Sequence, residues 1–256
     1  MRLRLLCLST AMLGCAPPPE LGGSDDTSTT TPGASSDDGV DSTAGSMGDL
    51  DPMQLDRSEA MGACGYPGAG PMGYGTEPGQ RLANNTNFVL ETCDGDPVEF
   101  ADLMCPRDDN KHNRGILLNI GAGWCLPCQE ETLEFPILYD EFHDRGIEIV
   151  QVMFQDWDAQ TPTSTFCEDW TSGQWSVGEG GSSQDQGVVL QFPVLLDQVF
   201  DWTSIYLQDP QAATPINMLI DANGNIRWKL EGQKPSLDLL RAQLELVIQE
   251  PYAPPS

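Results

Sequence analysis

Basic residues are scarce in this 256-residue chain. It contains 12 Lys and Arg residues against 39 Asp and Glu, which gives a formal net charge of -27 at pH 7. Proteins bind the phosphates of nucleic acids mainly through clustered cations, so this balance excludes nucleic acid as an electrostatic partner. An acidic surface aids solubility but identifies no other partner.

Histidine is also rare, and His112 and His143 are the only two. A zinc site needs nitrogen or sulfur ligands at short spacings, and neither histidine is part of such a pattern. A c-type haem needs histidine directly after a Cys-x-x-Cys pair. Gln129 occupies that position here. The sequence therefore predicts neither a metal ion nor a cofactor.

Apolar runs of membrane-spanning length are missing, because a spanning helix needs about 20 such residues. The N-terminal run is shorter: Arg2 and Arg4 precede a leucine-rich stretch that ends at Leu13. This pattern is typical of an export signal. Leu13-Gly14-Cys15 resembles a bacterial lipobox, which implies a signal peptide over residues 1–14 and lipidation of Cys15. Ordinary cleavage nearby, with Cys15 unmodified, is the alternative.

Low-complexity sequence rich in Gly, Ser, Thr and Asp follows. It has almost no apolar side chains to offset the entropy of ordering. We therefore expect residues 15–60 to form a disordered tether, with an end-to-end distance of roughly 35–40 Å. Residues 61–85, rich in Gly, Pro, Tyr and Met, are expected to form an irregular covering segment, and residues 251–256 a tail.

Between these segments, residues 86–250 alternate between strand and helix patterns. Short apolar or alternating runs predict strands at 88–90, 98–100, 116–120, 147–154, 192–197, 215–220 and 226–230. Helical patterns cover 129–139, with a break at Pro136, and then 161–170, 199–206 and the segment after Ser236. Such alternation requires parallel strand pairs with both faces covered, and the last hairpin makes the sheet mixed.

Trp124-Cys125-Leu126-Pro127-Cys128 places two thiols with two residues between them, after an apolar run and before a predicted helix. At a helix N-terminus, free N–H groups and the helix dipole favour the thiolate and lower the pKa of a cysteine. Pro127 suits a first helical turn, where its missing N–H costs nothing. A redox centre is therefore the leading hypothesis, with a structural disulfide or half of a zinc site as alternatives.

Four cysteines remain once Cys7, Cys15 and the proposed redox pair are set aside. An even number in an exported chain indicates disulfides, and four cysteines allow three pairings. Cys93 and Cys105 flank a short segment, so we expect them to pair. Cys64 would then pair with Cys167.

Several motifs, in this order of elements, resemble the thioredoxin fold. Within that fold they resemble the TlpA-like thiol-disulfide oxidoreductases, or redoxins, of bacterial envelopes. The resemblance covers roughly Thr86 to Gln249. The motifs are Ala122–Cys128 (A-x-W-C-x-x-C), Phe192–Asp197, Ala213-Thr214-Pro215 and Ile220–Ile226. The resemblance implies a thioredoxin-like three-layer α/β sandwich with a mixed central sheet, helices on both faces and a β-α insert.

The resemblance also implies roles for individual residues. Cys125 would attack a substrate disulfide, and Cys128 would resolve the mixed disulfide that results. A cis Thr214–Pro215 bond would lie against the sulfurs, and Thr214 and Trp124 would contact the substrate.

One position departs from cytosolic thioredoxins, which carry a buried Asp six residues before the first active-site cysteine. Asn119 occupies that position. An Asn cannot accept the proton of Cys128, so the group that manages this proton is left open.

The predicted function is thiol-disulfide exchange on protein disulfides in the cell envelope, with reduction or exchange favoured. The predicted partners are protein thiols and disulfides, and a membrane electron donor or redox partner protein. The predicted location is the periplasmic side, lipid-anchored, and Ala16 is compatible with the outer membrane. A non-catalytic thioredoxin-fold scaffold lipoprotein is one alternative. A peroxiredoxin-type peroxidase is another alternative. That family's motif has Thr or Ser three residues before the reactive Cys and Pro four residues before that. If Cys128 were the reactive Cys, these positions would be Cys125 and Gly121.

Overall fold

The computed structural model describes residues 72–82, 90–98, 100–104, 113–175, 177–178, 185–207 and 213–251. The chain divides into two units, Met1–Gly48 and Asp49–Ser256, and every described residue lies in the second. The predicted signal peptide, the lipidation site and the tether therefore lie outside the described residues. Among the helices that are described, none is long and apolar enough to cross a membrane.

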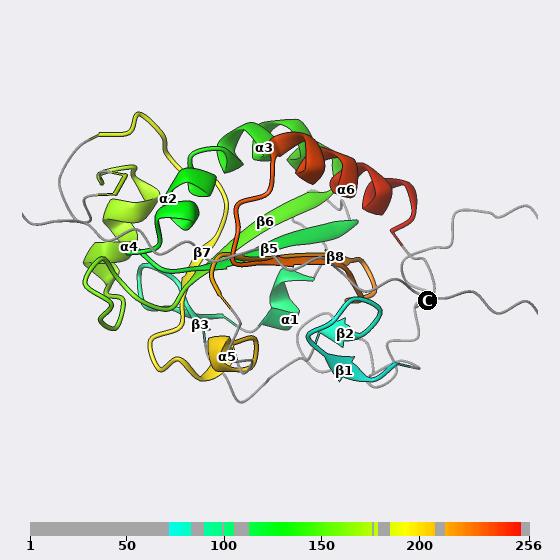
Figure 1. Cartoon of the computed structure of the whole chain (residues 1–256), viewed down its shortest axis with the longest axis horizontal. Helices are drawn as coiled ribbons and strands as arrows, with labels where there is room; N and C mark the ends of the chain where they lie inside the picture. Colours follow the sequence, from blue (N-terminus) through cyan, green and yellow to red (C-terminus); the bar gives the residue numbers. More distant parts are fainter. Residues whose placement is uncertain are drawn as a thin grey trace, which may run out of the picture. The chain divides into compact units, whose positions relative to one another are not determined.

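The centre of the fold is a seven-stranded sheet with the order β4-β3-β7-β6-β5-β8-β9 (Figure 1). Strands β5 (Gly115–Gly121), β6 (Ile147–Met153) and β7 (Val194–Leu196) run parallel to one another. Every residue of β5 is buried, as expected for a parallel strand that is covered on both faces. The strands predicted at 116–120, 147–154 and 192–197 are thereby confirmed.

Antiparallel strands complete both edges of the sheet. On one side, β8 (Ile216–Asp221) pairs with β5 and forms the predicted hairpin with β9 (Ile226–Glu231). On the other side, β3 (Leu90–Glu91) pairs with β7 and forms a hairpin with β4 (Pro97–Val98). The predicted mixed sheet is therefore confirmed.

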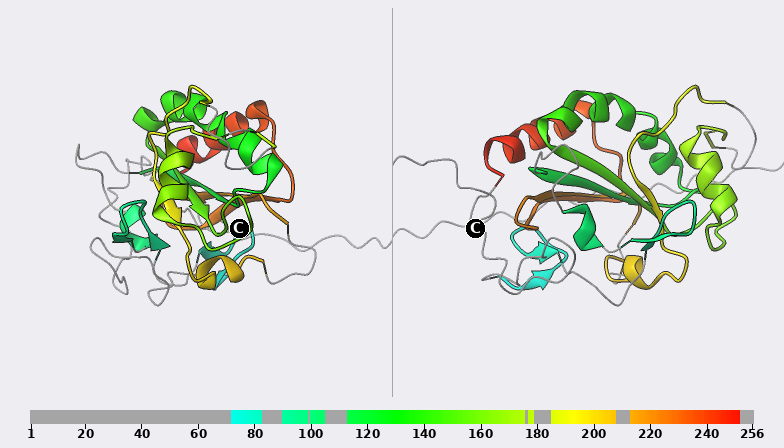
Figure 2. Two further views of the ribbon diagram at one scale, coloured as in Figure 1. Left: turned by 90° about the vertical axis from the view of Figure 1, so that its left-hand side faces the viewer. Right: turned by 180° about the vertical axis from the view of Figure 1, so that it is seen from behind.

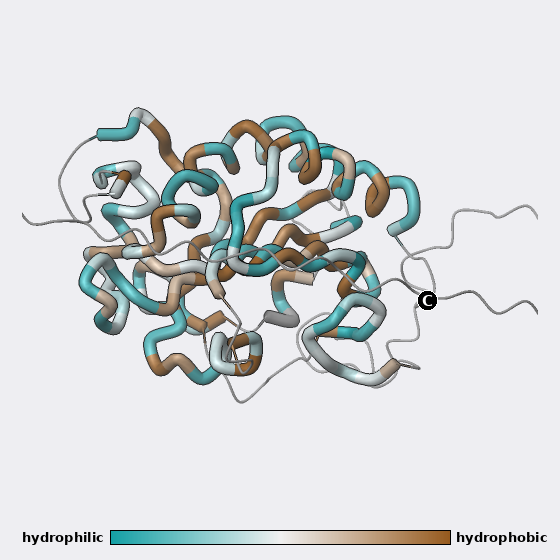
Figure 3. Tube along the Cα trace, viewed as in Figure 1, coloured by the Kyte–Doolittle hydropathy of each residue, from teal (hydrophilic) through white to brown (hydrophobic). Residues whose placement is uncertain are grey.

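Helices cover both faces of this sheet (Figures 1 and 2). On one face lie α3 (Phe135–Phe142), α4 (Ser164–Thr171) and α6 (Leu237–Gln249), and on the other lie α1 (Phe100–Leu103) and α5 (Asp201–Ser204). Two apolar clusters fill the spaces between the layers, and the apolar segments of the chain concentrate in the central strands (Figure 3). The predicted three-layer arrangement is confirmed.

Local sequence signals determine where most helices begin and end. Pro136 lies in the first turn of α3, so the predicted helix over 129–139 is divided into α2 (Leu126–Thr132) and α3. The Ser236 side chain accepts a hydrogen bond from Leu239 N at 3.2 Å and caps α6 as predicted. The start of α4 differs from the prediction, because Thr163 caps it and Pro162 precedes the helix.

The segment over residues 72–82 packs against the β8–β9 hairpin. It contains β1 (Tyr74–Gly75) and β2 (Arg81–Leu82), which run parallel to each other. Backbone bonds from Gly79 N to Ile226 O (2.8 Å) and from Leu82 N to Gly224 O (2.9 Å) attach it to the hairpin. This segment satisfies polar backbone groups that the edge of the sheet would otherwise expose.

The disulfide between Cys93 and Cys167 corrects the predicted pairings. Its S–S distance is 1.97 Å, and 74 residues separate the two cysteines in sequence. Cys93 follows β3, which pairs with β7, and Cys167 lies on α4, which contacts β7. Neither cysteine can therefore bond to its expected partner, Cys105 or Cys64, and both of those lie outside the described residues.

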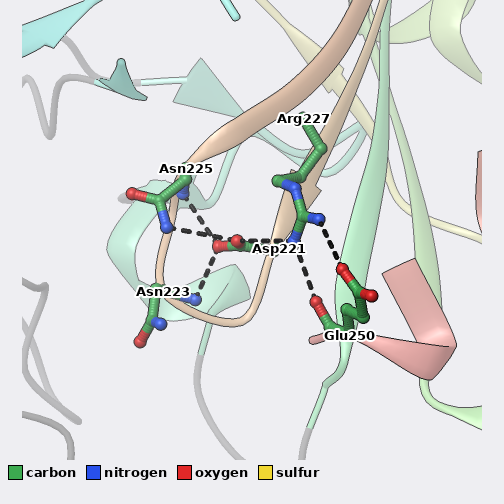
Figure 4. Close-up of polar contacts among 5 residues, drawn as sticks. All are labelled: Asp221, Asn223, Asn225, Arg227 and Glu250. Atoms are coloured by element: carbon green, nitrogen blue, oxygen red, sulfur yellow. Dashed lines mark hydrogen bonds and ion pairs between the residues drawn. The ribbon is translucent and has the colours of Figure 1, made fainter. Parts of the chain in front are cut away.

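A buried carboxylate holds the β8–β9 turn together (Figure 4). Asp221 accepts hydrogen bonds from Asn223 N (2.9 Å), Asn225 N (3.0 Å) and Asn225 Nδ2 (3.1 Å). Arg227 lies 3.3 Å from the same carboxylate and also donates to Glu250 O at 2.8 Å, at the end of α6. Burial raises the pKa of Asp221, and these hydrogen bonds and Arg227 oppose that rise. The turn is therefore fastened to the C-terminal helix.

Asp221→Ala should destabilise the protein substantially. It leaves the N–H groups of Asn223 and Asn225 without their acceptor, and unpaired buried groups of this kind cost about 1–3 kcal/mol each. We expect chemical denaturation to show a loss of roughly 2–4 kcal/mol. The control is Asp238→Ala, which removes a carboxylate that is 97% exposed. Equal effects of the two substitutions would contradict a structural role for the Asp221 contacts.

Candidate active site at the start of helix α2

Cys125 and Cys128 form a disulfide at the N-terminus of α2. The S–S distance is 2.13 Å and the Cα atoms are 5.2 Å apart. Cys125 is the N-cap residue, and its sulfur accepts a hydrogen bond from Cys128 N at 3.3 Å. Pro127 lies in the first turn, as predicted. Both cysteines are buried, with 3% and 0% of their surfaces exposed.

The turn before Cys125 is tightly packed. Gly123 N donates to Gln155 O at 2.8 Å, and Cys125 N donates to Ala122 O at 3.1 Å. A Cβ atom on Gly123 would lie 2.7 Å from the ring of Phe166 and 2.8 Å from backbone carbon of Asp156. Glycine is therefore required at position 123, because α4 and the loop after β6 approach the active-site turn from outside.

Exposed apolar side chains flank the buried disulfide. Trp124 is 47% exposed, and its Nε1 donates to Gln155 Oε1 at 2.8 Å. Leu126, on the other side of Cys125 in sequence, is 44% exposed. The disulfide thus lies below a rim that is apolar and accessible to another molecule.

The loop before β8 lies at the same end of the sheet. The Thr214–Pro215 peptide bond is cis, as the resemblance implied. Ile216 pairs with Ile120 in the register of β8 and β5. Pro215 therefore lies beside the point where β5 leaves the sheet toward Cys125, and Pro215 O accepts a hydrogen bond from Gly232 N at 2.9 Å.

A buried polar network underlies the disulfide. Asn119 on β5 donates through Nδ2 to Glu131 Oε2 and to Asn217 Oδ1, both at 3.0 Å. Its Oδ1 accepts from Gln151 Nε2 at 2.9 Å, and Gln151 Oε1 accepts from Trp170 Nε1 at 2.7 Å. All five residues are buried. The network therefore links β5, β6 and β8 to α2 and α4.

Glu131 is the carboxylic acid of this network. It lies three residues after Cys128 on α2, so it lies on the same face of that helix. Burial raises its pKa to about 8, and the amides of Asn217 and Asn119 oppose this rise in part. Lys234 also lowers this pKa, whereas Glu134 raises it. Glu131 is therefore largely protonated at neutral pH.

The sequence pattern did not single out Glu131 as a functional residue. It stands in a helical stretch with Glu130 and Glu134, where glutamates usually face solvent. The available signal was its spacing of three from Cys128, which places both side chains on one helix face. Its burial depends on Asn119 and Asn217 in neighbouring strands, and no local pattern predicts that contact.

The sequence of this region matches a known protein family. The profile described as the AhpC/TSA family matches residues 82–229, which is more than half of the chain. The chain belongs to the AhpC/TSA family. In this chain, the matched region contains the Cys125–Cys128 disulfide, the buried polar network, the cis proline and most of the central sheet.

Curated relatives of this AhpC/TSA protein are thiol-disulfide oxidoreductases. ResA of a Bacillus cereus strain is 24% identical over 164 residues, which cover 64% of this chain and 74% of ResA. ResA of Oceanobacillus iheyensis is 34% identical over 156 residues, covering 61% and 65% respectively. A putative DsbE from Chlorobium tepidum shows 17% identity, a TM-score of 0.48, and coverage of 67% of this chain and 98% of its own.

The family and the Cys125–Cys128 disulfide together identify a thioredoxin-like thiol-disulfide oxidoreductase. The structure brings together Cys125, Cys128 and Trp124, and places the cis Thr214–Pro215 bond beside the turn that carries them. Cys93 and Cys167 form a separate disulfide. Cys15, Cys64 and Cys105 lie outside the described residues, among which no cluster of His, Cys, Asp and Glu could hold a metal ion.

Proposed function

We propose that this enzyme exchanges disulfides with other proteins, with Cys125 as the attacking thiol and Cys128 as the resolving thiol. The disulfide between the N-cap and the first turn of α2 is the observation that carries this proposal. In the reduced enzyme, the Cys128 N–H that now points at the Cys125 sulfur stabilises a thiolate there. That thiolate attacks one sulfur of a substrate disulfide, so that the substrate S–S bond breaks, a mixed disulfide with Cys125 forms and the other substrate sulfur leaves as a thiolate.

Cys128 then attacks the Cys125 sulfur, which releases the substrate as a thiol and restores the disulfide of the enzyme. This step requires that Cys128 first lose its proton. We propose that ionised Glu131 accepts it, because its pKa of about 8 is close to that of an ordinary thiol, about 8.5. Run in reverse, the same steps oxidise a substrate dithiol.

Two further residues are proposed to contact the substrate. Thr214 lies beside the active-site turn, where its backbone N–H and C=O can pair with an extended substrate chain. Trp124 is half exposed next to Cys125, where its ring can cover the substrate. Pro215 completes this proposed site, because its cis peptide bond lies beside the point where β5 leads to Cys125.

The proposed location is the cell envelope, on its periplasmic side. The N-terminal sequence supports it: a basic and apolar signal, the lipobox-like Leu13-Gly14-Cys15, and then a polar segment. Lipidated Cys15 would anchor the chain, and Ala16 favours the outer membrane. Protein thiols and disulfides would be the substrates, and a membrane electron donor or redox partner protein would restore the enzyme.

Reduction or exchange is the favoured direction. The reduction potential of the Cys125–Cys128 pair decides it, and equilibration with glutathione buffers measures that potential. We expect a value closer to about -270 mV, typical of the reductant thioredoxin, than to about -120 mV, typical of the oxidant DsbA. A value near that of DsbA would contradict the favoured direction.

The test of the function is reduction of a protein disulfide, such as those of insulin, with a small dithiol as electron donor. Turnover by the wild-type enzyme is the expected result. Absence of turnover would support the scaffold alternative. Turnover with hydrogen peroxide but not with a protein disulfide would support the peroxidase alternative.

A further inference from the structure

The buried Gln129 side chain joins two segments that are far apart in sequence. Its Nε2 donates to Gly123 O at 2.6 Å, in the turn that precedes Cys125. Its Oε1 accepts from Gly178 N at 2.6 Å, in the connection between α4 and β7. Gln129 is 2% exposed although it directly follows the redox pair on α2. The catalytic steps proposed above do not use it.

The two contacts require a side chain that donates a hydrogen bond on one side and accepts one on the other. A carbonyl oxygen can only accept a hydrogen bond and a backbone N–H can only donate one. The side chain between Gly123 O and Gly178 N must therefore present a donor on one side and an acceptor on the other. An uncharged Gln does both, whereas Lys, Arg and ionised Glu each lack one of the two functions.

The effect of these bonds is to hold Gly178 beside the active-site rim. A Cβ atom built on Gly178 would lie 3.9 Å from Leu126 Cδ1, in ordinary van der Waals contact. Leu126 separates the first cysteine from Pro127, and almost half of its surface remains exposed. The exposed backbone at Gly178 thus lies next to the part of the rim that Leu126 forms.

We propose that Gln129 is a positioning residue that fixes Gly178 beside Leu126 and thereby forms one wall of the docking surface for protein substrates. This proposal rests on the proposed disulfide exchange with proteins. The molecule that binds this surface is an extended segment of a protein that carries a disulfide. Only such a chain is long enough to contact Cys125 and Gly178 at the same time. A small disulfide reacts at the sulfur and does not need the wall.

Gln129→Leu tests the proposal, because Leu fills a similar volume but makes neither hydrogen bond. We expect KM for a protein disulfide to rise about fivefold, the equivalent of about one net hydrogen bond. The value of kcat, and the rate with oxidised glutathione, should stay within about twofold. An unchanged KM for the protein substrate, or an equal loss with both substrates, would overturn the proposal.

Gln186→Leu is the matched control. Gln186 lies in the same connection between α4 and β7, and its Nε2 donates to Trp175 O, also at 2.6 Å. That bond stays within the connection and does not reach α2. The control should leave KM unchanged, and an equal rise in the control would show that general order of the connection matters rather than the bond to Gln129.

A measurement on the wild-type enzyme completes the test if the variant does not fold. The Gly178 amide should exchange with deuterium at least about tenfold more slowly than an open amide, because Gln129 accepts its hydrogen bond. Rapid exchange of Gly178 would overturn the proposal. Lack of activity on protein disulfides in the wild-type enzyme would instead refute the proposed function and would leave this exchange result intact.

Discussion

Cys125→Ser should abolish disulfide exchange, with a loss of turnover on the order of 10³-fold or more. The thiolate is the nucleophile, and a serine hydroxyl cannot form the mixed disulfide. The sulfur of Cys125 is the one that accepts the N–H of the first turn of α2, so no other group in the pair has this stabilisation. Insulin reduction, followed by turbidity with a small dithiol as donor, measures the effect.

Cys128→Ser separates the two thiol roles. Without a resolving thiol, the reaction should stop after the first attack and the enzyme should accumulate as a mixed disulfide with its substrate. Non-reducing gels and intact mass identify this adduct, and wild-type enzyme under the same conditions is the control. The assignment would be reversed if Cys125→Ser trapped the substrate and Cys128→Ser did not.

Much of the scaffold around this pair is predictable because it depends on local signals. The run Ile116–Ile120 is apolar and bounded by glycines, and it forms β5 at the centre of the sheet. Pro136 and Ser236 act through backbone geometry and capping, and both delimit helices where predicted. The redox pair is local as well, since two intervening residues place both sulfurs in one turn.

Contacts between distant segments could not be predicted in the same way. Cys93 pairs with Cys167 because β3 adds to β7 beneath α4, and that strand order is a property of the whole sheet. Gln129 and Glu131 are polar residues of a short helix, a pattern that usually indicates a solvent-facing side. Their burial results from packing against Gly178, Asn119 and Asn217. The polar contacts of the site therefore mostly join residues that are far apart in the sequence.

Stability should fall as pH rises because of Glu131. Its pKa is about 8 in the folded protein against an ordinary value of 4.5. Between these values the folded state binds more protons than the unfolded state, so the free energy of unfolding decreases with pH. The slope is about 1.4 kcal/mol per pH unit, which gives a loss of roughly 5 kcal/mol at most.

Glu131→Gln should remove this slope. The amide resembles the protonated carboxyl, so the variant should match wild type near pH 4–5 and exceed its stability by several kcal/mol above pH 8. Asp221, whose pKa burial also raises, affects both proteins alike, so their difference isolates Glu131. Urea denaturation at several pH values measures this difference. Parallel stability curves for the two proteins would contradict the buried, protonated state of Glu131.

The same substitution should slow catalysis even though it stabilises the fold. If ionised Glu131 accepts the proton of Cys128, Glu131→Gln should slow resolution of the mixed disulfide by about 10²-fold. The rate of this step in wild type should rise with pH and level off near pH 8, whereas in the variant the rate below pH 8 should be about 10²-fold lower and should depend only on the ionisation of Cys128 itself. Single-turnover decay of a preformed mixed disulfide measures the step directly. A variant that resolved the mixed disulfide at the wild-type rate below pH 8 would exclude Glu131 as the base. Since the variant is expected to be the more stable protein at pH 8, a slower reaction there cannot result from unfolding.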